Sequence, residues 1–64
     1  MDTEIRSARV KVENKQFFFD LRENQAGRYL KITEISGRRS TIIIPEDGLA
    51  AFRDALLAIM EPLG

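Results

Sequence analysis

Aromatic and basic side chains gather in one short stretch of the 64-residue sequence, NKQFFFDLRENQAGRYLK at residues 14–31. Lysine and arginine neutralise phosphates, and an aromatic ring stacked on a nucleobase contributes about 1–3 kcal/mol per base. On a sheet, alternate side chains project together, so this mixture predicts a surface for single-stranded nucleic acid. Packing in a core or a dimer contact is the alternative for each aromatic, above all Phe18. The candidate residues are Lys15, Phe18, Arg22, Arg28, Tyr29 and Lys31.

The sequence lacks the side chains that most catalytic and metal sites need. It contains no histidine and no cysteine, which excludes Ser–His and Cys–His catalysis, zinc sites and disulfides. Asp20 and Glu34 could face one another as a pair of acids, but the basic residues beside them favour ion pairs. We therefore expect no enzyme, no catalytic residue, no metal, no cofactor and no small-molecule substrate.

The charges are neutral in sum but divided along the chain. Residues 6–39 hold nine basic and four acidic side chains, whereas the rest of the sequence holds one basic and six acidic ones. A surplus of five cations in one segment indicates a surface for a polyanion. The alternative is that solvated lysines and arginines simply protect the strands from aggregation.

A period of two runs through the first two thirds of the chain, from about Ala8 to Ile44, and predicts strands at about residues 6–13, 16–23, 28–35 and 39–44. In the second segment this period places Phe17 and Phe19 on one face and Phe18 on the other. The run at residues 42–44, three isoleucines, predicts local burial on both faces. Turns are expected at residues 13–15, 24–27 and 36–38, where Asn and Gly occur.

The last segment changes to a helical period. Pro45 and the acidic residues after it favour a helix start, and Pro62 is expected to stop the helix, which we place at about residues 47–61. One apolar stripe follows the i, i+3, i+4, i+7 spacing, at Leu49, Phe52, Leu56, Ile59 and Met60. The fold class expected is therefore α+β, a four-stranded antiparallel meander followed by one helix able to cover one face.

The chain is short for a stable single domain, because a domain of this size buries only about 60% of its unfolded surface. With no disulfide or metal to add stability, a homodimer is the simplest source of further apolar contact. No apolar run approaches the roughly 20 residues of a membrane span, and the N-terminus does not resemble a signal peptide. We expect a cytoplasmic protein with no membrane partner, associated with the nucleoid if it is bacterial.

The hairpin sequence resembles a PUR repeat, the unit of the Pur-alpha family of purine-rich-element-binding proteins. The similarity lies in the order of a polar turn with lysine, an aromatic pair, a basic residue two before an asparagine, and GR-aromatic-x-K, here residues 14–31. FRDAL at residues 52–56 is similar to a helix segment of the family, and the resemblance covers about residues 7–60. Phe19 stands where the family usually has leucine. Glu13 replaces a frequent glutamine, and residues 25–26 lack a common basic residue, so affinity or base preference could differ.

The resemblance implies a Whirly-like PUR repeat, four strands and one helix over residues 1–64, two copies of which intertwine. A single-repeat chain would resemble the short, mostly bacterial members that form homodimers. The family's contacts, transferred by position, are Asn14, Lys15, Arg22, Asn24, Arg28 and Tyr29. In this picture Lys15 and Arg22 contact phosphate, Asn24 reaches a base edge or sugar, and Tyr29 stacks on a base; the resemblance leaves the role of Phe18 open.

Two functional hypotheses follow. The first is a sequence-tolerant, purine-preferring protein that binds single-stranded DNA or RNA and regulates transcription or a later step. The second is a non-catalytic protein-interaction or assembly module that binds no nucleic acid, which the zero net charge favours.

Overall fold

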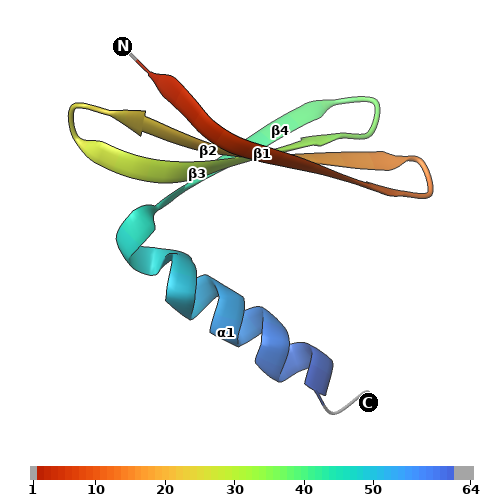
Figure 1. The fold of residues 1–64 in the computed structure, drawn as a ribbon. Coiled ribbons are helices and arrows are strands. Elements are labelled where there is room, and N and C mark those ends of the chain that lie inside the picture. The colour runs from red at the N-terminus through yellow and green to blue at the C-terminus, as the bar shows by residue number, and fades with distance from the viewer. Residues whose placement is uncertain (1, 62–64) are drawn as a thin grey trace.

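The computed structural model describes residues 2–61 and consists of a sheet followed by one helix (Figure 1). The elements are β1 (Thr3–Val12), β2 (Lys15–Asn24), β3 (Gly27–Ile35), β4 (Arg39–Pro45), the short 3-10 helix η1 (Glu46–Gly48) and α1 (Leu49–Met60). The predicted four-stranded antiparallel sheet with one following helix is confirmed. The expected helix stop at Pro62 lies outside the described residues.

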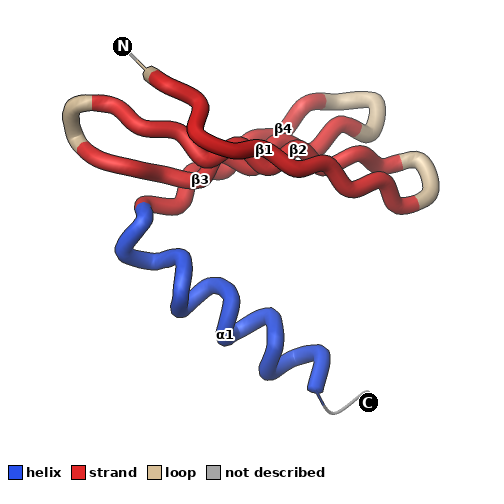
Figure 2. Tube along the Cα trace, viewed as in Figure 1, coloured by secondary structure: helices blue, strands red, loops and turns tan. Residues whose placement is uncertain are grey.

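The sheet is a simple meander in which neighbours in sequence are neighbours in space, β1-β2-β3-β4. Short turns connect the strands (Figure 2). Gly27, which follows the β2–β3 turn, has a φ of +130°, and Gly37 in the β3–β4 turn has a φ of +86°. Glycine adopts such angles without a Cβ clash. Glu13, in the β1–β2 turn, has a φ of +53°, where a residue with a Cβ is less favourable.

The strand register divides the sheet into two faces, because residues paired directly across strands project to the same side. One set, which we call the apolar face, comprises Ala8, Val10, Phe17, Phe19, Leu21, Leu30, Ile32, Ile42 and Ile44. The other set, which we call the polar face, comprises Arg9, Lys11, Phe18, Asp20, Arg22, Tyr29, Lys31, Thr33, Arg39, Thr41 and Ile43. The period of two therefore separated Phe18 from Phe17 and Phe19 correctly.

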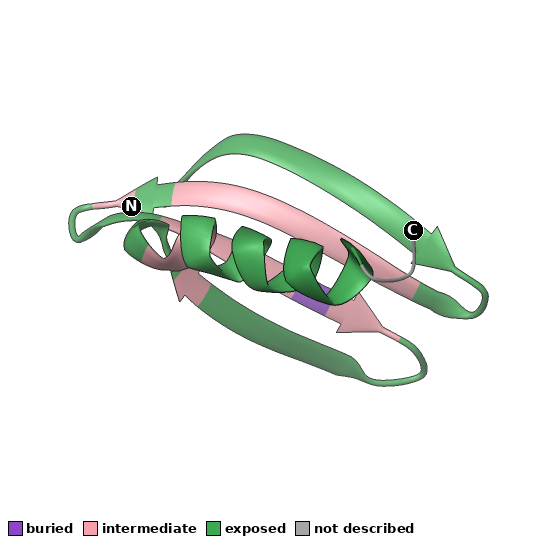
Figure 3. Cartoon of the chain, turned by 90° about the horizontal axis from the view of Figure 1, so that it is seen from below, coloured by how far each residue is buried: buried purple, intermediate pink, exposed green. Residues whose placement is uncertain are grey.

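No hydrophobic residue among residues 2–61 is fully buried, and the one buried side chain is that of Thr33 in the central strand β3. The apolar residues of β2 and β3 are half-buried, mainly by their strand neighbours (Figure 3). The expected burial of the isoleucine run on both faces is wrong for this chain, since Ile42 and Ile43 are 51% and 53% exposed. The reason is that β4 is an edge strand and no other segment of the described chain covers it.

The helix leaves the sheet instead of closing over it. Gly48 lies beside the apolar face, where a Cβ at this position would be 3.7 Å from Cγ2 of Ile44. From there α1 extends below the sheet (Figure 1), and every residue from Ala50 to Met60 is exposed. Its stripe of Phe52, Leu56 and Met60 is about half exposed, and Ile59 is 72% exposed. Two apolar surfaces of one chain, the sheet face and the helix stripe, thus lack a partner within residues 2–61.

Candidate nucleic-acid interface

The polar face joins basic and aromatic side chains near the β2–β3 turn. The register places Arg22 directly opposite Tyr29 and Asp20 directly opposite Lys31. The strands place five basic residues on this face, Arg9, Lys11, Arg22, Lys31 and Arg39, against the acids Glu4 and Asp20, and the carboxylate of Asp2 also reaches it. Adjacent antiparallel strands hold these side chains about 5 Å apart in a fixed array, which suits recognition of an extended polymer.

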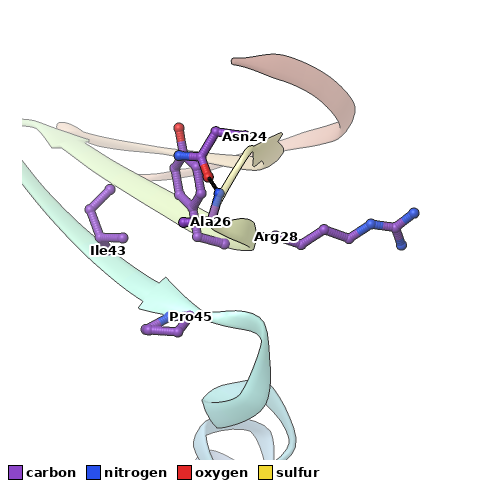
Figure 4. Close-up of a pocket in the computed structure, with 7 residues that line it drawn as sticks. Asn24, Ala26, Arg28, Ile43 and Pro45 are labelled. Atoms are coloured by element: carbon purple, nitrogen blue, oxygen red, sulfur yellow. Dashed lines mark hydrogen bonds between the residues drawn. The ribbon is translucent and has the colours of Figure 1, made fainter. Parts of the chain in front are cut away.

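The β2–β3 turn itself is ordered by Asn24. Its side-chain oxygen Oδ1 accepts a hydrogen bond of 2.8 Å from the backbone N–H of Ala26 (Figure 4). The turn therefore uses the acceptor of Asn24 and leaves its amide Nδ2 as a donor. An open hollow of about 330 Å³ lies beside this turn and is lined by Asn24, Ala26, Gly27, Arg28, Tyr29, Ile43 and Pro45.

The acidic start of the chain lies against the pair formed by Arg22 and Tyr29. The Tyr29 hydroxyl donates a hydrogen bond to the carboxylate of Asp2. Nε of Arg22 lies 4.0 Å from Oδ2 of Asp2, and Nη1 lies 4.0 Å from Oε1 of Glu4. The hydrogen bond to the Asp2 carboxylate raises the pKa of Tyr29, because it favours the neutral phenol, while the nearby Arg22 acts in the opposite direction. The carboxylates of Asp2 and Glu4 thus lie 4.0 Å from the guanidinium of Arg22.

Phe18 is displayed on the polar face rather than in a core. Its side chain is half-buried, and the guanidinium carbon of Arg9 lies 6.0 Å from the centre of its ring. Two open hollows border the ring, one of about 370 Å³ on the β1 side and one of about 220 Å³ on the β3–β4 side. The structure therefore confirms the side of the sheet that the period of two predicted for Phe18.

Three of the residues expected in the interface do not project from the polar face beside Arg22 and Tyr29. Lys15 belongs to the same face as Phe17, and its Nζ is 3.2 Å from Oε2 of Glu34. Arg28 is opposite Glu23 on the other face, with its Nε 3.6 Å from Oε2 of Glu23, although it also lines the hollow beside the β2–β3 turn. Asn14 lies in the β1–β2 turn, at the other end of β2 from Asn24 and about 33 Å from it.

The structure brings Phe18, Arg22, Asn24, Tyr29 and Lys31 to one face, and it adds residues that the sequence did not suggest. Arg9 lies over Phe18, and Arg39 borders the second hollow beside it. Asp2 lies against Tyr29. The alternation of β1 alone could have indicated Arg9, because it places that side chain on the other face of the strand from the apolar Ala8 and Val10. The contact of Asp2 depends on a register shift between Glu4 and Arg6, for which no sequence signal exists.

The possible pair of catalytic acids does not form. Asp20 projects from the polar face, whereas Glu34 is opposite Phe17 on the apolar face and pairs with Lys15. Within residues 2–61, no three carboxylate, histidine or cysteine side chains are grouped closely enough to hold a metal ion. In the same range, no helix has the length and apolar character needed to cross a membrane.

The sequence matches a family profile described as PurA ssDNA and RNA-binding protein over residues 2–64. The chain belongs to the PurA family. It is 54% identical over 54 residues to transcription factor Pur-alpha 1 of Arabidopsis thaliana, covering 83% of this chain and 18% of that protein. It is 38% identical over 60 residues to human transcriptional activator protein Pur-alpha, covering 81% and 19% of the two chains. Human purine-rich element-binding protein gamma is 32% identical over 69 residues, covering 86% and 20%.

This PurA-family chain therefore spans about a fifth of the length of these relatives. The match confirms the resemblance that the hairpin residues suggested, and it agrees with a chain that carries one PUR repeat.

Proposed function

We propose that this PurA-family protein binds single-stranded DNA or RNA with a preference for purine-rich sequences, and that it regulates transcription or a later step of gene expression. The observation that carries the proposal is the strand register that places Arg22 opposite Tyr29 on a polar face rich in cations. The family description and the names of the relatives, which include a transcription factor and a transcriptional activator, support the same function. A non-catalytic role accords with those names.

Each side chain of this group has a chemical role in the proposal. The guanidinium of Arg22 and the ammonium of Lys31 contact phosphates, and the phenol ring of Tyr29 stacks on a base. The amide Nδ2 of Asn24, which the turn leaves as a donor, reaches a base edge or a sugar oxygen. Phosphate displaces the carboxylates of Asp2 and Glu4 from Arg22 at low cost, because exposed ion pairs contribute only about 0–1 kcal/mol.

The functional unit that we propose is a homodimer of two intertwined copies. The apolar face of the sheet and the stripe of α1 are both exposed in one chain, and no described hydrophobic residue is fully buried. A second copy offers the complementary surfaces. Its helix stripe can cover the apolar sheet face of the first copy, and the helix stripe of the first copy can cover the apolar sheet face of the second. This arrangement leaves both polar faces open to nucleic acid.

Fluorescence anisotropy with a labelled purine-rich single strand tests the nucleic-acid proposal. We expect the logarithm of the affinity to fall linearly with the logarithm of the salt concentration, since cations that neutralise phosphates release counterions. Replacing Arg22→Ala and Lys31→Ala together removes two phosphate contacts and should make this slope shallower by about 1.4. The matched control is Arg38→Ala with Arg53→Ala, which removes two exposed cations outside the polar face.

An affinity for the single strand that does not depend on salt concentration would contradict the assignment of Arg22 and Lys31 to phosphate contacts. An affinity that falls equally in both double variants would contradict it too. The protein-interaction alternative predicts that no strand shifts on a gel at low salt and that protein purified from cells carries no nucleic acid.

A further inference from the structure

Two hollows on the polar face meet at the same pair of residues. The hollow on the β1 side is lined by Ser7, Ala8, Arg9, Phe18 and Asp20. The hollow on the β3–β4 side is lined by Phe18, Asp20, Lys31, Thr33, Ile35 and Arg39. Phe18 and Asp20 thus form a ridge between them. Along β2, Phe18 is four residues and about 13 Å from Arg22, and Asp20 is two residues and about 7 Å from it, so one extended strand could reach both the ridge and the row of Arg22 and Tyr29.

The distance between the Arg9 guanidinium and the Phe18 ring is close to the distance at which two flat groups can hold a third one stacked between them. The guanidinium carbon is 6.0 Å from the ring centre. A nucleobase stacked on both needs about 3.5 Å on each side, or about 7 Å in total. An outward movement of Arg9 by about 1 Å is therefore sufficient. Arg9 is exposed and forms no ion pair with any of residues 2–61, so nothing described holds it in place.

Asp20 supplies a hydrogen-bond acceptor at the edge of this gap. Its carboxylate is half-buried, and within the described chain it lies beyond 4.0 Å of every basic nitrogen, although Lys31 is opposite it across the strands. A carboxylate has two oxygens that only accept hydrogen bonds. Guanine is the base that presents two adjacent N–H donors, N1–H and N2–H, on its Watson–Crick edge, and one carboxylate can accept both.

We propose that Arg9, Phe18 and Asp20 form a guanine-selective clamp, in which the base stacks between the Arg9 guanidinium and the Phe18 ring and donates N1–H and N2–H to the Asp20 carboxylate. This inference rests on the proposed binding of single strands and adds a second base site to the one at Tyr29. Lys31 and Arg39, which line the neighbouring hollow, neutralise the phosphate beside the clamped base. The clamp gives the purine preference a physical cause.

The test compares two single strands of about 12 nucleotides, a length within the range of single-strand binding sites. One carries isolated guanines that cannot assemble into four-stranded structures, and the other carries inosine at the same positions. Inosine keeps N1–H and the ring but lacks the 2-amino group. We expect the protein to bind the guanine strand about tenfold more tightly, as measured by anisotropy at fixed salt. A third strand with 7-deazaguanine keeps the Watson–Crick edge and should bind like guanine.

The variants separate the three parts of the clamp. Asp20→Asn should bring the guanine-to-inosine ratio to about one, whereas its absolute affinity is not diagnostic because it also removes a negative charge. Arg9→Lys keeps the charge and loses the planar group, so affinity should fall about tenfold. Arg38→Lys is the matched control, since it makes the same exchange at an exposed arginine of the β3–β4 turn, outside the polar face, and should change nothing. Circular dichroism confirms that each variant folds.

The possible failures are distinct. If no single strand binds the natural sequence, the proposed function itself fails. If strands bind but the guanine-to-inosine ratio is already about one, or Asp20→Asn leaves a tenfold ratio unchanged, the clamp is overturned while the proposed function stands. If Arg9→Lys and Arg38→Lys bind equally well, stacking by Arg9 is excluded.

Discussion

At the scale of single residues, the proposed function implies a competition between carboxylates and nucleic acid on the polar face. Asp2 accepts the hydrogen bond of Tyr29 and, together with Glu4, lies near Arg22. Both carboxylates present acidic oxygens, the same chemistry that a phosphate offers. In the proposed function, the N-terminal end of β1 therefore limits how much of the affinity of Arg22 and Tyr29 is available to a strand.

Asp2→Asn tests this competition. Exposed ion pairs contribute about 0.2–1 kcal/mol, so removing the carboxylate should raise the affinity for a single strand about two- to fivefold. Asp47→Asn, in η1, is the control for a general loss of negative charge. An equal gain in both variants would contradict a local competition.

The same variant has a second measurable result, because Tyr29 is the only tyrosine in the sequence. A carboxylate beside the hydroxyl disfavours the phenolate and raises the pKa of Tyr29. In Asp2→Asn the pKa should therefore move down, toward the ordinary value of 10.0. Ultraviolet absorbance of tyrosinate follows this titration directly. A pKa that does not move would show that Asp2 does not hold the hydroxyl in solution.

Predictions for single residues were correct where they depended on the period of two. They could not be made where they depended on the register between neighbouring strands. Alternation placed Phe18 on the other face of the sheet from Phe17, which is correct. Alternation also separates Arg28 from Tyr29, its neighbour in β3, and groups Lys15 with Phe17. The alignment across the turns is needed to show that Tyr29 projects from the same face as Phe18. The contact between Arg9 and Phe18 joins two strands and depends on their pairing, which no single segment specifies.

At the scale of elements, the helix is the part of the chain whose position the sequence left undetermined. Its apolar stripe predicts that something covers it, because exposed apolar stripes of this size are unfavourable. The stripe does not specify whether the cover belongs to the same chain. In the structure α1 extends away from the sheet and remains exposed, so the helical pattern was correct and its expected packing surface was not within the chain.

Leu56→Asp tests whether a second copy covers the helix. In an isolated chain this residue is 54% exposed, so the change should have little effect on stability. In the proposed dimer the charge enters an apolar contact, and the dimer should dissociate or become less stable by several kcal/mol. Ala58→Asp is the matched control, because it introduces the same charge on the opposite side of α1. Light scattering and thermal unfolding at two protein concentrations measure both variants.

A folded monomer at low micromolar concentration, or equal behaviour of Leu56→Asp and Ala58→Asp, would contradict the intertwined arrangement. A concentration-dependent melting temperature that is lost in Leu56→Asp alone would support it, since dimer stability depends on protein concentration.

At the scale of the whole molecule, the net charge is zero but the charges are unevenly distributed. The basic surplus of residues 6–39 is balanced by acids near the two ends of the chain. In space the basic side chains are shared between the two faces, and the polar face keeps five of them against three acids, Asp2, Glu4 and Asp20. The sequence thus indicated a polyanion surface but overestimated how many of its cations lie together, because linear proximity along a strand does not specify a face.

The most direct test of the central claim is to map the nucleic-acid contact by nuclear magnetic resonance, titrating labelled protein with a purine-rich single strand. The account predicts that side-chain signals of Phe18, Arg22 and Tyr29 shift in proportion to bound strand, whereas those of Phe17, Phe19 and Ile32 on the apolar face do not. Shifts confined to the apolar face or to α1, or no shift at any strand concentration, would contradict the assignment of the polar face to nucleic acid.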